Sequence, residues 1–286
     1  MKIGIVFPQT EIGNDPAVIR DFAQASEEMG FNHLLVYDHV LGADRNRPGG
    51  FEGPYDKDTA FHEPFVLFGF LAGVTQTIEL VTGVIILPQR QTALVAKQCA
   101  EISVLSGGRL RLGIGVGWNA IEYEALGESF SNRGQREEEQ VEVLRALWEN
   151  EIVDFDGRWH RVPHAGINPR PESKIPIWFG GGTDALLERA ARIGDGWLPL
   201  VPPDDRGKEA VEKIVRHLDD AGRDRESFGI EPQARILGGT PERWRKHAKG
   251  WRELGATHIS IVTMGAKLAR PEDHLKAASE WRDAIS

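Results

Sequence analysis

The residue types best suited to chemistry are a carboxylate and an imidazole side by side, Asp38 and His39. An imidazole takes up and releases a proton near neutral pH, so such a pair in a pocket can perform general acid–base work. The pair ends a predicted strand over residues 33–38. A second interpretation stays open, in which Asp38 caps the following loop and His39 is merely exposed.

Glycines near predicted strand ends form a second group of candidates. A glycine inside the strand-like segment 82–84 indicates either a bulge or the close approach of a ligand. Alternating glycines in the segment 113–119 allow a flat ligand to lie against the backbone beside Trp118, and their spacing does not match a dinucleotide fingerprint. The two segments supply the candidates Thr82, Gly83, Val84, Gly115, Val116, Gly117 and Asn119.

The run Gly180, Gly181, Gly182 and Thr183 stands directly before a predicted helix. Free backbone N–H groups at a helix start, with the hydroxyl of Thr183, favour phosphate binding, although a flexible turn would have the same sequence. No Gly-Lys-Ser/Thr follows, so this is not a P-loop. The histidines lack the His-Glu-x-x-His spacing and no Gly-x-Ser-x-Gly occurs, so neither a metal site nor a serine nucleophile is predicted.

Strand-like runs alternate with helical patterns along the whole chain. Predicted strands cover residues 3–7, 33–38, 78–86, 109–116, 176–180, 196–198, 231–236 and 258–263, and each is followed by a predicted helix. This repetition predicts one domain over residues 1–286, with a parallel sheet closed into a (β/α)8 barrel. The alternative is an open doubly wound sheet, which usually carries a glycine fingerprint where this chain has Pro8, Gln9 and Thr10.

In such a barrel the active site lies at the C-terminal ends of the strands and in the loops that follow them. The connection 39–62 follows the second strand and is long and rich in glycine and proline, so it is a predicted lid or substrate wall. The connection 151–174 precedes the fifth strand, on the opposite face, and is predicted to be structural.

The overall charge narrows the range of partners. A net charge of −9 disfavours non-specific binding to nucleic acid or to an anionic membrane. No apolar run approaches the ~20 residues of a membrane-spanning helix, and the N-terminus lacks a leader pattern, so a cytoplasmic protein is expected. The single cysteine, Cys99, is predicted to be buried and unreactive.

These segments resemble the luciferase-like monooxygenase superfamily, and within it the actinobacterial-type deazaflavin-dependent oxidoreductases. The resemblance covers nearly the whole chain and is strongest over residues 79–127. The motifs that carry it are Leu80-Val81-Thr82-Gly83-Val84, Leu105-Ser106-Gly107-Gly108-Arg109, Gly115-Val116-Gly117-Trp118-Asn119, Glu122-Tyr123, Ile177-Trp178-Phe179-Gly180-Gly181-Gly182 and Gly194-Asp195-Gly196-Trp197.

The resemblance implies a barrel that binds FMN or coenzyme F420, a 5-deazaflavin. The ring would lie near Asp38, Gly83-Val84 and 115–117, with the phosphate at the loop 180–183. The Asp38-His39 pair favours the deazaflavin, with His39 as general acid or base and Asp38 orienting it or contacting the ring. Phe7, Trp118 and Trp197 are the predicted substrate-pocket residues.

Two further features follow from the same resemblance. The sugar-phosphate dehydrogenases of the family have a glutamate acid where this chain has Trp118, which argues against that substrate. A non-proline cis peptide is expected at Gly83-Val84, where it would form a ledge for the ring. Gly83→Val would then fill the ledge and weaken cofactor binding while leaving much of the core intact.

The sequence is compatible with three functions. The first is hydride transfer between coenzyme F420 and a small organic substrate. The second is FMN-dependent oxygen insertion, with a separate reductase as partner, and the third is a non-catalytic flavin-binding barrel. Family habit predicts a homodimer in each case.

Overall fold

The computed structural model describes residues 1–286 and has a parallel sheet surrounded by helices. The strands of that sheet are β1 (Lys2–Val6), β2 (His33–Val36), β3 (Glu79–Thr82), β4 (Ile85–Ile86), β5 (Leu110–Gly115), β8 (Ile177–Gly180), β9 (Gly196–Leu198), β10 (Gly229–Ile230), β11 (Gln233–Arg235) and β12 (His258–Val262). The α-helices are α1 (Pro16–Glu28), α2 (Pro64–Val74), α3 (Thr92–Ser106), α4 (Ala120–Ala125), α5 (Arg133–Glu149), α6 (Asp184–Ile193), α7 (Asp205–Asp220), α8 (Pro241–Glu253) and α9 (Pro271–Ile285).

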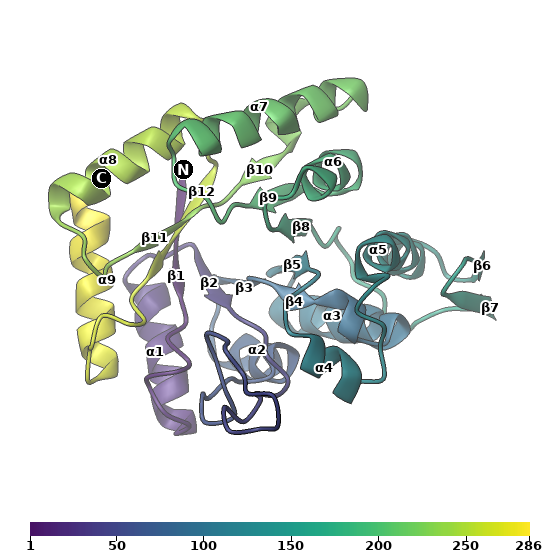
Figure 1. Ribbon diagram of the computed structural model, residues 1–286, viewed down its shortest axis with the longest axis horizontal. Helices are drawn as coiled ribbons and strands as arrows, with labels where there is room; N and C mark the ends of the chain where they lie inside the picture. The colour runs from purple at the N-terminus through teal and green to yellow at the C-terminus, as the bar shows by residue number, and fades with distance from the viewer.

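The sheet curls strongly, and one chain segment bridges its two ends. The strand order is β10-β9-β8-β5-β3-β2-β1-β12-β11, with β4 paired to β5. β10 pairs with β9 and β11 pairs with β12, although only two residues separate β10 from β11. In Figure 1 the helices form a ring around this sheet, which is the arrangement of an α/β barrel.

Two predicted strands are interrupted. The predicted run 78–86 is divided into β3 and β4, with a cis peptide bond at Gly83-Val84 as expected from the resemblance. The predicted run 231–236 begins earlier, at Gly229, and is divided at Glu231 and Pro232. Proline has no N–H to donate to a neighbouring strand, which accounts for the second break.

Helix starts follow the local sequence signals closely. The Asp15 carboxylate accepts from the Ala17 N–H at 2.8 Å, with Pro16 at the first helical position of α1. The Glu63 carboxylate caps α2 in the same way, at 2.7 Å from the Val66 N–H. None of the helices combines the length and the apolar character that a membrane crossing requires.

The connection 151–174 contains an antiparallel hairpin that the sequence analysis missed. Its strands are β6 (Val153–Asp156) and β7 (Arg161–Ala165), and they project from the right-hand edge in Figure 1. Most of their side chains are half-buried or exposed, so they lack the buried alternation that identified the other strands. Residues 37–63 join β2 to α2 without helix or strand.

The strands present alternate side chains to two different environments. A large cluster of 55 buried residues, Ile5 and Phe7 among them, lies between the sheet and the helices. A small cluster of Val6, Leu35, Val81 and Val262 lies on the other face, inside the curled sheet. Because side chains alternate with a period of two, a shift of one position moves a strand residue from one environment to the other.

Candidate functional site

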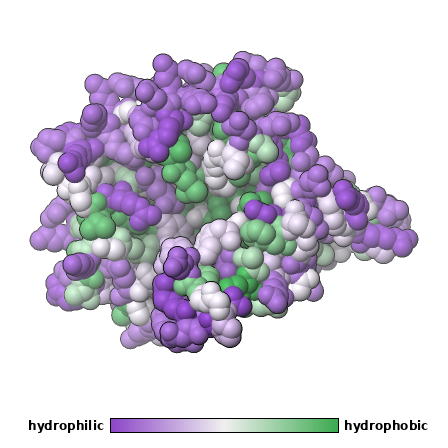
Figure 2. All heavy atoms as spheres, in the orientation of Figure 1, coloured by the Kyte–Doolittle hydropathy of each residue, from purple (hydrophilic) through white to green (hydrophobic).

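A cavity of about 420 Å³ opens at the C-terminal ends of the strands. Figure 2 shows the corresponding hollow near the centre of the face, surrounded by apolar groups within a largely hydrophilic surface. The lining residues come from six strand ends and the loops after them: Tyr37, Asp38, His39, Tyr55, Gly83, Val84, Ile86, Gly115, Val116, Gly117, Trp118, Gly180, Gly181, Gly182, Thr183, Leu186, Leu198, Pro199, Leu200, Gln233 and Arg235. Most of the predicted cofactor residues are among them.

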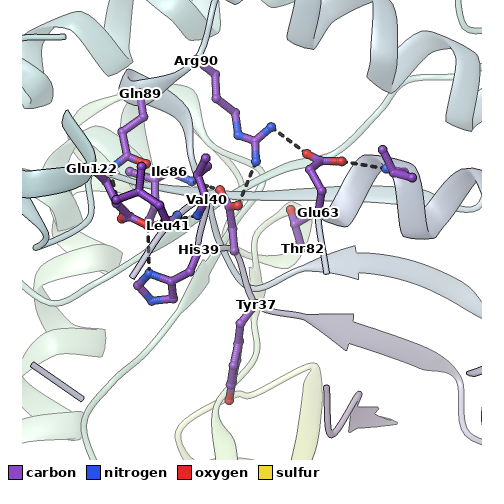
Figure 3. Close-up of polar contacts among 12 residues, drawn as sticks. Tyr37, His39, Val40, Leu41, Glu63, Thr82, Ile86, Gln89, Arg90 and Glu122 are labelled. Atoms are coloured by element: carbon purple, nitrogen blue, oxygen red, sulfur yellow. Dashed lines mark hydrogen bonds and ion pairs between the residues drawn. The ribbon is translucent and has the colours of Figure 1, made fainter. Parts of the chain in front are cut away.

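His39 is held by a buried glutamate that is distant in sequence. Its Nδ1 lies 3.2 Å from the Oε1 of Glu122, which is 1% exposed (Figure 3). A carboxylate can only accept, so the Nδ1 of neutral His39 carries the proton. No hydrogen bond within the chain occupies Nε2, and that nitrogen is left as the acceptor for a ligand proton.

The same carboxylate organises the start of the long loop after β2. Glu122 Oε1 also accepts from the backbone N–H groups of Val40, at 3.0 Å, and Leu41, at 3.3 Å, and its Oε2 accepts from Gln89. Burial alone would raise the pKa of Glu122, but the hydrogen bonds from His39, Gln89 and Leu41 hold it below its ordinary value. Glu122 therefore acts as an ionised anchor for His39 and its loop.

Asp38 lines the cavity but does not orient His39, which corrects one of the two predicted roles. One carboxylate oxygen accepts from Arg90 at 2.8 Å and the other from the Ile86 N–H at 3.0 Å. Arg90 also binds Glu63, the residue that caps α2 (Figure 3). Asp38 thus ties β2 to the first residues after the cis peptide, and its carboxylate has little capacity left for a ligand.

The glycines of β5 and β8 make room for Val84. A Cβ on Gly115 would lie 2.7 Å from one Val84 methyl group, and a Cβ on Gly180 would lie 2.6 Å from the other. The prediction that the glycines of segment 113–117 leave a free surface for a flat ligand is therefore incomplete, because Val84 occupies the space beside Gly115. The chain at 83–84 itself forms the ledge that faces the cavity.

Gly83 has a different constraint from the one predicted. A Cβ there would lie 2.3 Å from Leu35 Cδ2, inside the curled sheet. A larger side chain at Gly83 would therefore collide with the inner core before it filled the ledge. The expectation that Gly83→Val spares the core is corrected on this ground.

The loop 180–183 forms one wall of the cavity and leads into α6. The Thr183 hydroxyl caps the helix, accepting from the Leu186 N–H at 3.3 Å. The N–H groups of Gly182 and Thr183 bond to no protein acceptor, and a Cβ on Gly182 would meet no atom within 4 Å. These are the properties of a turn that can surround an anion at a helix N-terminus.

Four predicted site residues do not reach this cavity. Phe7 and Trp197 point away from the inside of the sheet, towards Phe22 and Trp251 respectively. Thr82 is buried, with its hydroxyl bonded to the backbone of Gly113. Asn119 caps α4 and borders a neighbouring cavity instead.

Trp197 still influences the site indirectly. Its Nε1 donates to the carbonyl of Gly181 at 2.7 Å, so it holds the loop that precedes α6. The alternation of side chains explains the error: Gly196 and Leu198 face inwards, and Trp197 between them faces the helices.

Three aromatic side chains pack around His39. Ring centroids of Tyr55, Phe61 and Trp118 lie 5.0, 4.7 and 5.8 Å from the imidazole. Tyr55 and Phe61 belong to the connection between β2 and α2, so this loop does form a wall of the site. Trp118 lines the cavity as predicted and also stacks on Phe51 of the same loop.

Sequence reasoning missed several members of the site. Glu122 appeared only within a family motif, and no local spacing connects it to His39, 83 residues away. Tyr37, Gln233 and Arg235 also face the cavity. Arg235 could have been found from its position at the end of the seventh predicted strand. No group of three or more His, Cys, Asp or Glu side chains converges as a metal site would require.

The family assignment follows from comparison with known proteins. A model of the luciferase-like monooxygenase family matches residues 1–284, and the chain belongs to this family. An uncharacterized protein of Mycobacterium tuberculosis is 32% identical over 222 residues, which are 76% of this chain and 77% of the relative. An F420-dependent glucose-6-phosphate dehydrogenase of Amycolatopsis mediterranei is 28% identical over 237 residues, 77% of this chain and 67% of the relative.

Solved structures agree with this fold. The monooxygenase RslO1 from Streptomyces bottropensis superposes with a TM-score of 0.82 at 21% identity, covering 100% of this chain and 98% of that one. An F420-dependent secondary alcohol dehydrogenase in complex with an F420-acetone adduct gives 0.81 at 18% identity, covering 100% and 99%. The family match over residues 1–284 makes the chain an enzyme of the luciferase-like oxidoreductase and monooxygenase type.

Proposed function

We propose that this protein is an F420-dependent oxidoreductase that transfers a hydride to or from a small organic substrate. The observation that carries the proposal is the placement of His39, with Nδ1 fixed by Glu122 and Nε2 available, beside a cavity walled by a glycine loop. The F420-dependent relative supports the choice of cofactor.

The residues present fit a deazaflavin. About 420 Å³ lies within the usual range of small-molecule sites. The backbone at Gly83-Val84 and the apolar atoms of Ile86 and Leu198 offer apolar contacts for a ring system. The unpaired N–H groups of Gly182 and Thr183 would hold its phosphate.

A bound deazaflavin supplies a two-electron hydride at its C5 carbon. His39 completes the reaction with the proton. In the reducing direction, protonated His39 donates from Nε2 to the substrate oxygen as a carbonyl becomes an alcohol, and the reverse reaction returns that proton. Because Glu122 accepts from Nδ1, it keeps Nε2 directed at the substrate.

The aromatic wall supports this chemistry by limiting the exposure of His39 to water. Tyr55, Phe61 and Trp118 cover His39, whose side chain is only 13% exposed. In a water-poor site, the attraction between Glu122 and a protonated His39 is stronger than it would be in solvent.

Two titrations test the cofactor. Fluorescence quenching with F420 and with FMN should give the tighter dissociation constant for F420. Tighter binding of FMN would favour the alternative, an FMN-dependent monooxygenase that works with a separate reductase. Tight F420 binding without hydride exchange to any acceptor would favour a non-catalytic flavin-binding barrel.

A variant pair tests the role of His39. His39→Ala should lower turnover by about 10²–10⁴-fold while changing cofactor affinity little. His164→Ala is the matched control, because His164 is 77% exposed on the β6–β7 hairpin. Equal losses of turnover and cofactor affinity in His39→Ala would mean that His39 only contacts the cofactor.

We also infer that the chain forms a homodimer. The adjacent helices α2 and α3 expose Val66 (72%), Phe70 (40%) and Leu94 (52%), an apolar surface that a second copy would cover. Light scattering should give twice the mass of 31.8 kDa, and a monomeric mass at working concentration would contradict the inference.

A further inference from the structure

The residues Glu231, Gln233 and Arg235 lie on one face of the chain segment that bridges the ends of the sheet. Side chains at alternate positions of a strand point the same way, so all three face the inside. Glu231, the deepest, is fully buried and bonds to His33 and Arg111. Arg235 is the last of the three and therefore lies at the mouth of the cavity.

Gln233 and Arg235 differ in whether their side chains have hydrogen-bond partners within the chain. The Oε1 of Gln233 accepts from the Tyr37 hydroxyl at 2.7 Å. Arg235 lines the cavity with no hydrogen bond or ion pair to its guanidinium. Burial raises the pKa of Tyr37 and Tyr55, and the nearby positive charge of Arg235 opposes the shift in both. Arg235 is therefore close to two phenols that line the cavity, and no carboxylate of the chain neutralises it.

Arg111, the other arginine that faces the inside of the sheet, differs from Arg235 because it has acidic partners. Arg111, deeper inside the sheet, is 2% exposed and contacts both Glu79 and Glu231. Arg235 is the single Lys or Arg side chain among the residues that line the cavity, and it has no acidic partner. Its five N–H donors are thus available to a ligand.

Part of the rest of the cavity wall is apolar. Leu198 at the end of β9, and Pro199 and Leu200 after it, line the cavity, and Leu200 is 79% exposed. Trp118, at 44% exposed, adds a large apolar face on the loop after β5. A ligand that matches this lining has an apolar body and one anionic group.

We propose that the substrate is an apolar organic anion whose carboxylate or similar group binds Arg235, with its reacting carbon beside His39. This inference rests on the proposed function, because it assigns the substrate class of the same site. Guanidinium and carboxylate form charge-assisted, often bidentate hydrogen bonds, which fix the orientation of the bound molecule.

The test compares two probes of almost the same shape, phenylacetate and its neutral analogue phenylacetamide. Each is titrated by calorimetry into the protein, both free of cofactor and loaded with F420. Wild type should bind phenylacetate more tightly. Arg235→Gln should lose about 10- to 100-fold in affinity for phenylacetate and little for phenylacetamide. Arg235→Lys should recover part of the loss.

Control variants separate this effect from other causes. Arg216→Gln removes the same charge from an exposed position on α7 and should change neither probe. Trp118→Ala should weaken both probes alike, because it removes only apolar contact.

Three outcomes would overturn the proposal. They are equal binding of the two probes to wild type, an Arg235→Gln variant that keeps the preference for phenylacetate, and a loss of F420 affinity alone in that variant, which would make Arg235 a cofactor contact. Failure of wild type to bind F420 would overturn the proposed function instead, and the cofactor-free titrations would still report on Arg235.

Discussion

Glu122 should position His39 rather than merely fill space, and two substitutions distinguish these roles. Glu122→Ala leaves four donors without their acceptor: the imidazole Nδ1 of His39, the N–H groups of Val40 and Leu41, and the side-chain amide of Gln89. A buried donor without a partner costs about 1–3 kcal/mol. The loop borders a second cavity, so water can replace some of the lost hydrogen bonds. We therefore expect a total loss of about 2–4 kcal/mol in the free energy of unfolding.

Glu122→Gln keeps the shape and one acceptor oxygen but removes the charge. The side-chain amide of Gln89, whose Oε1 is buried without a partner, can rotate to accept from the new NH₂ group. The expected loss is the difference between a charged and a neutral hydrogen bond, about 1 kcal/mol. Urea unfolding of both variants gives these two values.

The pH dependence provides an independent check. The folded-state pKa of Glu122 lies below its ordinary value of 4.5, so its ionised form contributes stability that is present above that pH. The contribution disappears as the pH falls through the folded-state value. The gap in unfolding free energy between wild type and Glu122→Gln should therefore narrow below pH 4.5.

The decisive readout is the tautomer of His39, measured by nitrogen-15 NMR of the imidazole. Neutral His39 should carry its proton on Nδ1 in wild type and in Glu122→Gln, and on both nitrogens in a mixture in Glu122→Ala. An unchanged tautomer in Glu122→Ala, with unchanged stability, would refute the positioning role.

Three further changes test other parts of the site. Gly115→Ala places a Cβ 2.7 Å from a Val84 methyl group, so cofactor affinity should fall, and adding Val84→Ala should restore it; a fall that the second change does not relieve would contradict the packing argument. Arg90→Met leaves the Asp38 carboxylate buried without its cation and should cost about 3–5 kcal/mol in urea unfolding, whereas a cost near zero would mean that the pair is dispensable. Burial raises the pKa of Glu137 to about 7, so wild type should lose stability as the pH rises from 4.5 to about 7, and Glu137→Gln should remove that slope; parallel pH curves for the two proteins would contradict this.

The features that could be predicted from the sequence depend on residues that lie close together in the chain. Asp15-Pro16 and Glu63-Pro64 predict helix starts because a cap and its helix lie within one turn. The cis peptide at Gly83-Val84 came from the family motif and not from local chemistry.

The wrong and missed site residues have a different cause. They depend on the direction in which a side chain points, or on contacts between residues that are far apart in the chain. Phe7 and Trp197 lie near strand ends, but their sequence does not say which face of the strand they occupy, and both face the helices. Glu122 and His39 meet only because the loop after β2 and α4 are brought together by the barrel. Arg235 indicates a ligand site only because the structure places it in the cavity without an acidic partner, which the sequence does not show.

The central claim is that the cavity binds F420 in preference to FMN. Protein purified from a host that makes both cofactors can be denatured and the released ligand weighed by mass spectrometry. We expect the mass of F420. Release of FMN alone would contradict the claim and favour a flavin-dependent monooxygenase.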